Sequence, residues 1–322
     1  MNAAVGTAIR YVSLLVFTGI TLFILPEIIR LQHFLAALNR VGATLVMLGF
    51  LPYAGLTIKT GPLDLSLWNA NMYWYPALAP ITSVFVNPNA LGFLTLIGAI
   101  AAFVELQTHR TKISILLLGI NSLGLLFTNY RTGWIAFLAA TGVFVVYSIG
   151  GKRLLMLYTV CGLSVLSLLL MMIFSIIPGP AALTEVSLNN RRPRWVISIF
   201  ILQDQFWWGS GLGNVREAIQ PYTAEETGSV HNSYLRMFVA FGFGGGLVYL
   251  LFYLSVVFDS VRQSTEYRMV VIPALLIAFL FVQMFNDLTF IGVSMHSIVI
   301  ALSMGYCISS VADDKSTCNY IT

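Results

Sequence analysis

The sequence predicts an all-α protein that crosses a membrane about nine times. Of its 322 residues, 58% are hydrophobic and only 9% are charged, whereas soluble domains average about 25% charged residues. The mean hydropathy is +0.85. Uncharged stretches long enough for a helix to cross the hydrocarbon core, which takes around 20 residues, recur along the chain. We therefore expect a single transmembrane domain over residues 1–322.

The predicted spans follow one another with two longer loops between them. In order they cover residues 11–25, 41–58, 90–104, 113–128, 133–149, 154–177, 238–258, 269–285 and 290–309. The first span lacks the small-residue cleavage site of a signal peptide, so we treat it as a membrane anchor. The longer loops are residues 59–89, after the second span, and residues 178–236, between the sixth and seventh spans.

The distribution of Lys and Arg predicts the side of the membrane that each loop occupies, because short cytoplasmic loops are enriched in both residues. The loops alternate between the two sides of the membrane. In one set, which includes the long 178–236 insert, the short loops carry only Lys59 and Arg131. The other set and the C-terminal tail carry nine, namely Arg30, Arg40, Arg110, Lys112, Lys152, Arg153, Arg262, Arg268 and Lys315. This second set is therefore predicted to be cytoplasmic. The 178–236 insert then lies on the outer side of the plasma membrane.

The net charge of +4 follows from these inward-facing basic loops. It therefore gives no reason to expect a nucleic-acid partner, and the expected surroundings are membrane lipids. The outer loop 59–89 contains Trp68, Tyr73, Trp74 and Tyr75. Amphipathic rings favour the headgroup level of a bilayer, and stacking on a sugar is the alternative role for this cluster.

The 178–236 insert is predicted to contain short interfacial helices. Pro193 stands where the first turn of a helix tolerates proline, and apolar residues follow at helical spacing, namely Trp195, Ile199, Leu202 and Phe206. Gly209 and Gly211 suit a helix stop and a tight turn. A second helix is expected to start at His231-Asn232-Ser233, where Asn or Ser can cap it, and to run into the seventh span.

Four arginines gather on the predicted outer side, namely Arg131, Arg191, Arg192 and Arg194. An arginine at membrane depth is costly unless an anion pairs with it, and its fork matches phosphate geometry. Each of the four could instead reach lipid headgroups. Their clustering favours a specific anionic ligand, because a pyrophosphate carries more charge than one side chain neutralises.

His231 is the only histidine on the predicted outer side. A helix N-terminus and nearby cations both favour the neutral imidazole, which could accept a proton from a hydroxyl group. A structural role is the alternative for a single histidine. Glu225 and Glu226 could orient the ring, although such a pair in a loop is ordinarily solvated.

The outer acidic residues are scattered, with no D-x-D pair that could hold a divalent cation. We therefore predict neither a metal site nor a cofactor. A coupled transporter, the alternative class together with a flippase, should carry ionisable residues near mid-membrane. The central stretches of the predicted spans contain no Asp, Glu, Lys or Arg, which favours an enzyme. His296, in the last span, is predicted to be a packed polar group.

The polar motifs follow a definite order along the chain. They are Asn87-Pro88-Asn89, Thr128-Asn129-Tyr130-Arg131, Arg191 four residues before Trp195, the glycines Gly209, Gly211 and Gly213, and His231-Asn232-Ser233-Tyr234-Leu235 with Gly242 beyond. In order, topology and spacing this series resembles the O-antigen ligase and polymerase family. The resemblance extends from about Asn39 to the last span.

This resemblance implies a metal-independent, inverting membrane glycosyltransferase. Members move a glycan from a polyprenyl-pyrophosphate carrier to an acceptor hydroxyl on the outer side of the plasma membrane. Arg131 and Arg191 would bind the pyrophosphate, and His231 would activate or position a glycan or glycolipid acceptor. Substrate contacts are also expected from Arg192, Arg194, Asn232, Tyr234 and Asn89. A polymerase that joins repeat units is the alternative within the family.

Three features depart from the family pattern. Tyr130 stands where the family usually carries a small Ser, and Ala240 stands where it often carries an acid. Family ligases commonly have about three more spans, and the three spans after the large loop are retained here. We therefore expect a member shortened at the N-terminus, with an altered or impaired acceptor site.

Overall fold

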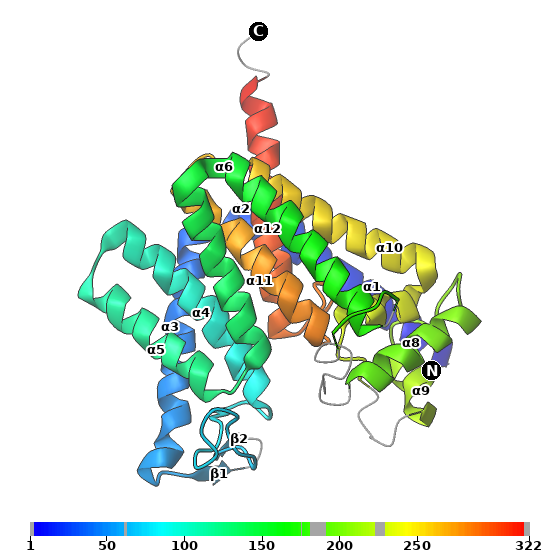
Figure 1. The fold of residues 1–322 in the computed structure, drawn as a ribbon, viewed down its shortest axis with the longest axis horizontal. Coiled ribbons are helices and arrows are strands. Elements are labelled where there is room, and N and C mark those ends of the chain that lie inside the picture. Colours follow the sequence, from blue (N-terminus) through cyan, green and yellow to red (C-terminus); the bar gives the residue numbers. More distant parts are fainter. Residues whose placement is uncertain (1–2, 61–62, 175, 181–190, 223–228, 319–322) are drawn as a thin grey trace. The chain divides into compact units, whose positions relative to one another are not determined.

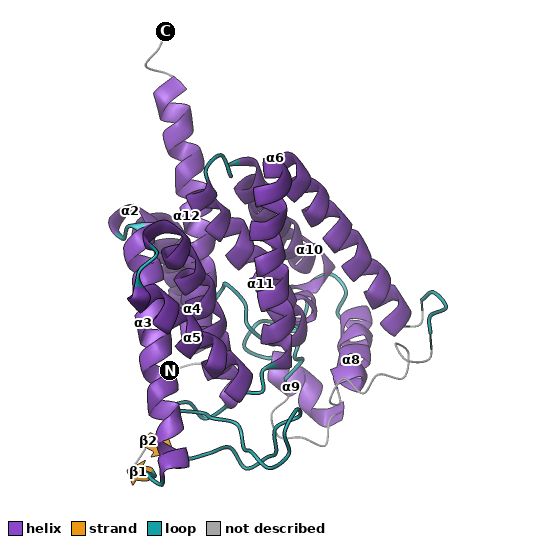
Figure 2. Ribbon diagram, turned by 60° about the vertical axis from the view of Figure 1, so that its left-hand side comes forward, coloured by secondary structure: helices purple, strands orange, loops and turns teal. Residues whose placement is uncertain are grey.

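A computed structural model describes residues 3–60, 63–174, 176–180, 191–222 and 229–318. In this part of the chain nearly all regular structure is helical, which confirms the all-α class (Figures 1 and 2). One short hairpin pairs β1 (Ile58–Thr60) with β2 (Leu63–Leu65). Glu225 and Glu226, considered above as partners of His231, lie outside the described ranges.

Among the described residues, five helices are long and apolar enough to cross a membrane, namely Tyr11–Ile28, Leu31–Ala54, Pro88–His109, Arg131–Ile173 and Ser233–Arg262. Three shorter apolar helices are Lys112–Phe127, Val271–Phe285 and Met295–Ser309. Every predicted span overlaps one of these helices. The fifth and sixth spans both lie in α6 (Arg131–Ile173), which is broken at Gly150 and Gly151. The structure therefore supports a membrane protein with several spans.

The N-terminal region differs in detail from the prediction. It contains α1 (Ala3–Gly19), a π-helical turn (Ile20–Ile24), α2 (Leu25–Ile28) and α3 (Leu31–Phe50). The second span was predicted to begin at residue 41, with Arg40 in a loop, but α3 begins ten residues earlier. The helix continues through this polar stretch because the polar side chains of the stretch have a hydrogen-bonding partner on α4 (Pro88–His109). Asn39 donates a hydrogen bond to Glu105 at 2.9 Å, and Arg40 lies 3.8 Å from the same carboxylate.

The described residues form two compact units. Unit 1 comprises Met1–Thr18, Val145–Thr265 and Gln283–Ser297, and unit 2 comprises Gly19–Phe144, Glu266–Val282 and Ile298–Thr322. Two helices are divided between the units. In α11 (Val271–Phe285) the last residues belong to unit 1, and in α12 (Met295–Cys318) the first residues do; the rest of each helix belongs to unit 2. Both units contain residues that the sequence analysis assigned to the site.

In unit 2, α3 and α4 pack with α5 (Lys112–Phe127) around small residues. The Asn121 amide occupies the space that a Cβ would need at Gly42 and Gly98. The same amide donates hydrogen bonds to the backbone and side-chain oxygens of Asn39 at 3.1 and 3.0 Å. Small residues let helices approach closely enough for such polar contacts between apolar surfaces.

In unit 1, the described part of the predicted insert shares a hydrophobic core with α10 (Ser233–Arg262) and with residues outside the insert. Helices α8 (Arg191–Asp204) and α9 (Val215–Ile219) pack together and against α10 (Figure 1). Trp195 is 0% exposed and lies between the rings of Phe174 and Phe285. The buried face of α8 is formed by Arg194, Trp195, Ser198 and Ile201. The predicted stripe was therefore partly wrong, because it was chosen from apolar residues alone.

The glycines after α8 allow close backbone contact with α10. Helix α8 ends at Asp204, before Phe206, whose ring stacks on Phe243 at 5.0 Å. Gly209 and Gly211 have positive φ values of 67° and 86°, which confirms the predicted turn. Ser210 and Gly211 donate backbone hydrogen bonds to Val239 and Ala240 in α10, at 2.8 and 2.9 Å. Their partner segment is distorted at Gly242, where φ is 69°.

Candidate active site

Arg131 begins α6 directly after a tightly packed tyrosine in unit 2. Tyr130 is 2% exposed, and its ring occupies the space that a Cβ would need at Gly92 and Gly133. Asn129 has a positive φ of 54°, so the chain turns sharply before the helix starts. The large side chain at position 130 is therefore accommodated by two glycines. Packing of Tyr130 holds the first residue of α6 at the end of the hairpin.

The Arg131 side chain is exposed and lies against an aromatic ring of the 59–89 loop. Its guanidinium carbon is 5.2 Å from the centre of the Tyr73 ring. The Tyr73 backbone N–H donates to the Asn129 side chain at 3.2 Å, which ties this loop to the hairpin. A cation on an aromatic face keeps its hydrogen-bond donors available to an anion. Asn89 also lies in unit 2, at the start of α4, where its N–H donates to the capping residue Asn87 at 2.7 Å.

The three arginines at the start of α8 differ in their surroundings. Arg191 and Arg192 are partly exposed, and the Arg191 guanidinium carbon is 5.9 Å from the Phe285 ring centre. Arg194 is only 5% exposed and donates to the Ser229 carbonyl oxygen at 3.4 Å. This contact connects α8 to the segment just before His231. Arg191 therefore presents a partly accessible cation, while Arg194 supports the fold of the site.

His231 precedes α10 in a backbone conformation that few residues adopt. Its φ is 53°, in the left-handed region, where His, Asn and Asp are enriched among non-glycine residues. Asn232 caps α10 as predicted, because its side chain accepts from the Leu235 N–H at 3.0 Å. Strained conformations persist where surrounding contacts determine them, and they concentrate at functional sites. The contacts that hold this segment come from the chain between α11 and α12.

Asp287 is the centre of those contacts. One carboxylate oxygen accepts from the Ser229 hydroxyl at 2.5 Å, and the other accepts from the Asn232 N–H at 3.2 Å. The His231 N–H in turn donates to Ser229 Oγ at 3.3 Å. Next to this pair, Ser233 donates to the Asn286 carbonyl oxygen at 2.6 Å. Asp287 thus holds the residues on both sides of His231.

This role of Asp287 was missed in the sequence analysis, which counted it only as one of several scattered outer acids. Its position between two apolar spans was the available signal, because acids close to membrane spans are uncommon. Phe285, two residues earlier, lies under Arg191. The segment 285–287 therefore contacts both Arg191 and the His231 turn, so unit 1 brings these two predicted site residues to one short segment.

Two predicted substrate contacts have partners within the protein. Asn232 is buried and uses its side chain as the helix cap. The Tyr234 ring lies edge-on to Tyr249 and Tyr253, at 6.3 and 6.4 Å between centres. These contacts give Asn232 and Tyr234 a clear structural role. No group of three His, Cys, Asp or Glu side chains in the described ranges is arranged to hold a metal ion.

Given the catalytic role that the family resemblance implies for His231, replacing Asp287 with alanine is expected to lower kcat for glycan transfer by about tenfold to a hundredfold, because small misplacements of a catalytic group have effects of that size. The KM for the donor should change little, because the same resemblance implies that Arg131 and Arg191 bind the pyrophosphate. Steady-state kinetics of purified protein would measure both quantities. Asp64→Ala is the control, since Asp64 makes an exposed 3.8 Å pair with Lys59, and such pairs contribute about 0–1 kcal/mol. Equal kcat values for the two variants would exclude the positioning role.

The middle of the chain matches a known protein family. Residues 113–250 match the profile of the family described as O-Antigen ligase. No curated protein has a significant match to the chain. The matched range includes the Arg131 hairpin, the arginines of α8, the paired glycine segments and the His231 turn. Residues 113–250 are therefore similar to the O-antigen ligase family, which supports the resemblance found in the sequence.

Proposed function

We propose that this protein transfers a glycan from a polyprenyl-pyrophosphate carrier to an acceptor hydroxyl on the outer face of the plasma membrane. The observation that carries the proposal is the His231 turn. It stands in a strained conformation beside a carboxylate that anchors it, and the adjoining segment contacts Arg191. A proton acceptor and a phosphate-binding cation are the two groups that this chemistry needs.

In the proposed reaction the acceptor oxygen attacks the anomeric carbon of the donor sugar. The bond between that carbon and the pyrophosphate oxygen breaks, and the configuration at carbon inverts. The acceptor proton passes to the His231 imidazole, and the pyrophosphate leaves on its polyprenyl carrier. Arg131 and Arg191 stabilise the charge that develops on the leaving oxygen. Arg192 lies beside Arg191 and is proposed to contact the same anion.

Removal of either arginine is expected to lower transfer about a hundredfold, because a well-placed donor to a developing anion contributes roughly 3 kcal/mol. Arg131→Lys and Arg191→Lys should restore only part of the loss, since an ammonium group lacks the bidentate fork. The measurement is donor consumption by purified Arg131→Ala and Arg191→Ala proteins. Arg153→Ala is the control, because Arg153 is exposed on α6, just after the break at Gly150 and Gly151, in a stretch predicted to be cytoplasmic. Full activity of both alanine variants would refute the proposed roles.

The reaction itself is tested with a defined polyprenyl-pyrophosphate oligosaccharide, in detergent and with EDTA present. A lipid core glycan and a second donor molecule are supplied separately as acceptors. Transfer to the core glycan would establish a ligase, and a ladder of longer glycans would establish a polymerase. Donor that binds without being consumed would overturn the proposal and favour a transporter or flippase.

A further inference from the structure

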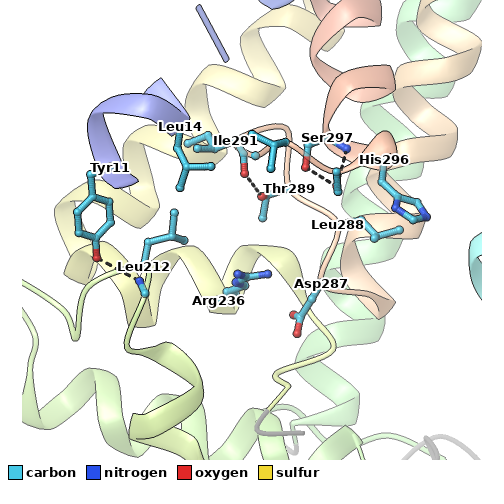
Figure 3. A pocket seen from close by; sticks show the side chains of 14 residues that line it. Tyr11, Leu14, Leu212, Arg236, Asp287, Leu288, Thr289, Ile291, His296 and Ser297 are labelled. Atoms are coloured by element: carbon cyan, nitrogen blue, oxygen red, sulfur yellow. Dashed lines mark hydrogen bonds between the residues drawn. The ribbon is translucent and has the colours of Figure 1, made fainter. Parts of the chain in front are cut away.

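Unit 1 contains a cavity of about 470 Å³ next to the His231 turn (Figure 3). Its walls come from α1, the turn at residues 212–213, the first turn of α10, and the chain between α11 and the start of α12. Tyr11 closes one side, because its hydroxyl accepts from the Gly213 N–H at 3.1 Å. The volume lies within the roughly 300–1,000 Å³ typical of small-ligand sites. His296, which was predicted to be a packed polar group, also lines the cavity.

The two charged side chains on the cavity wall, Arg236 and Asp287, differ in how they are satisfied. Figure 3 draws both among the side chains that line the cavity. The Asp287 carboxylate already accepts hydrogen bonds from Ser229 and Asn232. Within the described part of the chain, the Arg236 guanidinium has neither a hydrogen bond nor an ion pair. The cavity therefore contains a partly buried cation whose donors remain available.

A partly buried cation without a partner is costly, and an anionic ligand would remove that cost. A single guanidinium matches one carboxylate or one phosphate monoester through a pair of parallel hydrogen bonds. A pyrophosphate carries more charge than one guanidinium neutralises, and the repulsion from Asp287 on the same wall, which any anion meets, grows with that charge. The remaining surface mixes hydroxyl groups, including Ser297, with apolar side chains such as Leu14 and Leu288. Such a mixture suits a sugar ring, which has both hydroxyl groups and apolar faces.

We propose that this cavity binds an anionic sugar of the acceptor, a residue that carries a carboxylate or a phosphate, with Arg236 holding the anionic group. The assignment rests on the proposed glycosyl transfer and adds a preference for acceptor charge. Asp287 connects the two sites, since it lines the cavity and anchors the turn that carries His231. An acceptor sugar held there lies next to the segment that positions the proton acceptor.

The test measures binding of three soluble monosaccharides, glucuronic acid, glucose 6-phosphate and glucose, to the purified protein in nanodiscs of zwitterionic lipid. Saturation-transfer NMR titrations give the dissociation constants. The charged sugars are expected to bind at least about tenfold more tightly than glucose, because a charge-assisted hydrogen bond contributes roughly 1.5–3 kcal/mol. A difference between glucuronic acid and glucose 6-phosphate identifies which anion the site prefers.

Arg236→Gln is expected to abolish the preference for charged sugars. Arg216→Gln is the matched control, because Arg216 is exposed on α9 and does not line the cavity. Equal affinity for all three sugars, or a preference that survives Arg236→Gln, would overturn the assignment. Loss of sugar binding in nanodiscs that contain phosphatidylglycerol, with glycerol phosphate binding as tightly as the sugars, would also overturn it in favour of a lipid headgroup.

These outcomes are separate from a failure of the proposed reaction, because no donor is present in the binding experiment. If the preference is absent while the Arg191 and His231 variants lose transfer, only the acceptor site is wrong. If those variants keep full transfer, the proposed mechanism fails whatever the cavity binds.

Discussion

Replacing His231 with asparagine is expected to lower the transfer rate by about a hundredfold to ten-thousandfold, the range attributed to general acid–base catalysis. The reason is chemical, because an amide can position a hydroxyl group by a hydrogen bond but cannot take its proton. Asparagine is chosen because the backbone at this position is left-handed, with φ at 53°. Asn tolerates this conformation better than alanine does. The Asp287 contacts to neighbouring residues should therefore persist.

Single-turnover donor consumption by purified His231→Asn protein measures this effect, and thermal unfolding in the same detergent checks that the fold is intact. His231→Gly is the second variant, since glycine adopts the conformation freely and removes every side-chain contact. Loss of activity in both variants, with unchanged unfolding temperatures, supports proton transfer. Normal activity in the asparagine variant with a loss in the glycine variant would show that His231 positions the acceptor without taking its proton.

Gly242→Ala is expected to destabilise unit 1 strongly, by about 3 kcal/mol or more. Gly242 has φ at 69° and ψ at −174°, a region that is essentially restricted to glycine and costs other residues about 1–3 kcal/mol. A Cβ there would also collide with the Trp207 carbonyl group. Since this segment pairs with residues 206–211, the substitution separates two parts of the insert core. Glycosyl transfer should fall together with stability.

Thermal unfolding followed by tryptophan fluorescence measures this change, and a decrease of several degrees is expected. Gly244→Ala is the matched control, because Gly244 lies in the same helix and a Cβ at this position meets no other atom within 4 Å. Alanine is a better helix former than glycine by about 1 kcal/mol, so the control should be at least as stable as the parent protein. Equal unfolding temperatures for the two variants would contradict the role of Gly242.

The pattern of neighbouring residues was sufficient to predict those elements that depend only on contacts within about 20 residues along the chain. Each predicted span overlaps an apolar helix, one of the two capping residues expected before the seventh span does cap α10, and Gly209 and Gly211 form the predicted turn. The boundaries were least accurate where polar residues extend a helix. Arg40 and Asn39 lie inside α3 because Glu105 on another helix satisfies them, and a search for uncharged stretches cannot anticipate that partner.

The candidate site could be predicted in part. The types and order of Arg131, Arg191 and His231 predicted the family that the profile match supports. Arg194 had the same appearance in sequence as Arg191, yet only the structure shows that it is buried against Ser229. Asp287 was overlooked because it is 56 positions from His231 in the chain, and nothing local to either residue records their contact.

The sequence by itself determined that this chain is an all-α membrane protein and which polar residues are available for chemistry. Those properties follow from composition and from hydrogen bonds and burial between near neighbours along the chain. Only the tertiary structure decided that Tyr130 fits against Gly92 and Gly133, that the insert closes around Trp195, and that Asp287 supports the His231 turn while Arg236 faces a cavity. These depend on shape and on hydrogen bonds between segments far apart in sequence, and such contacts form only when the packed helices bring the segments together.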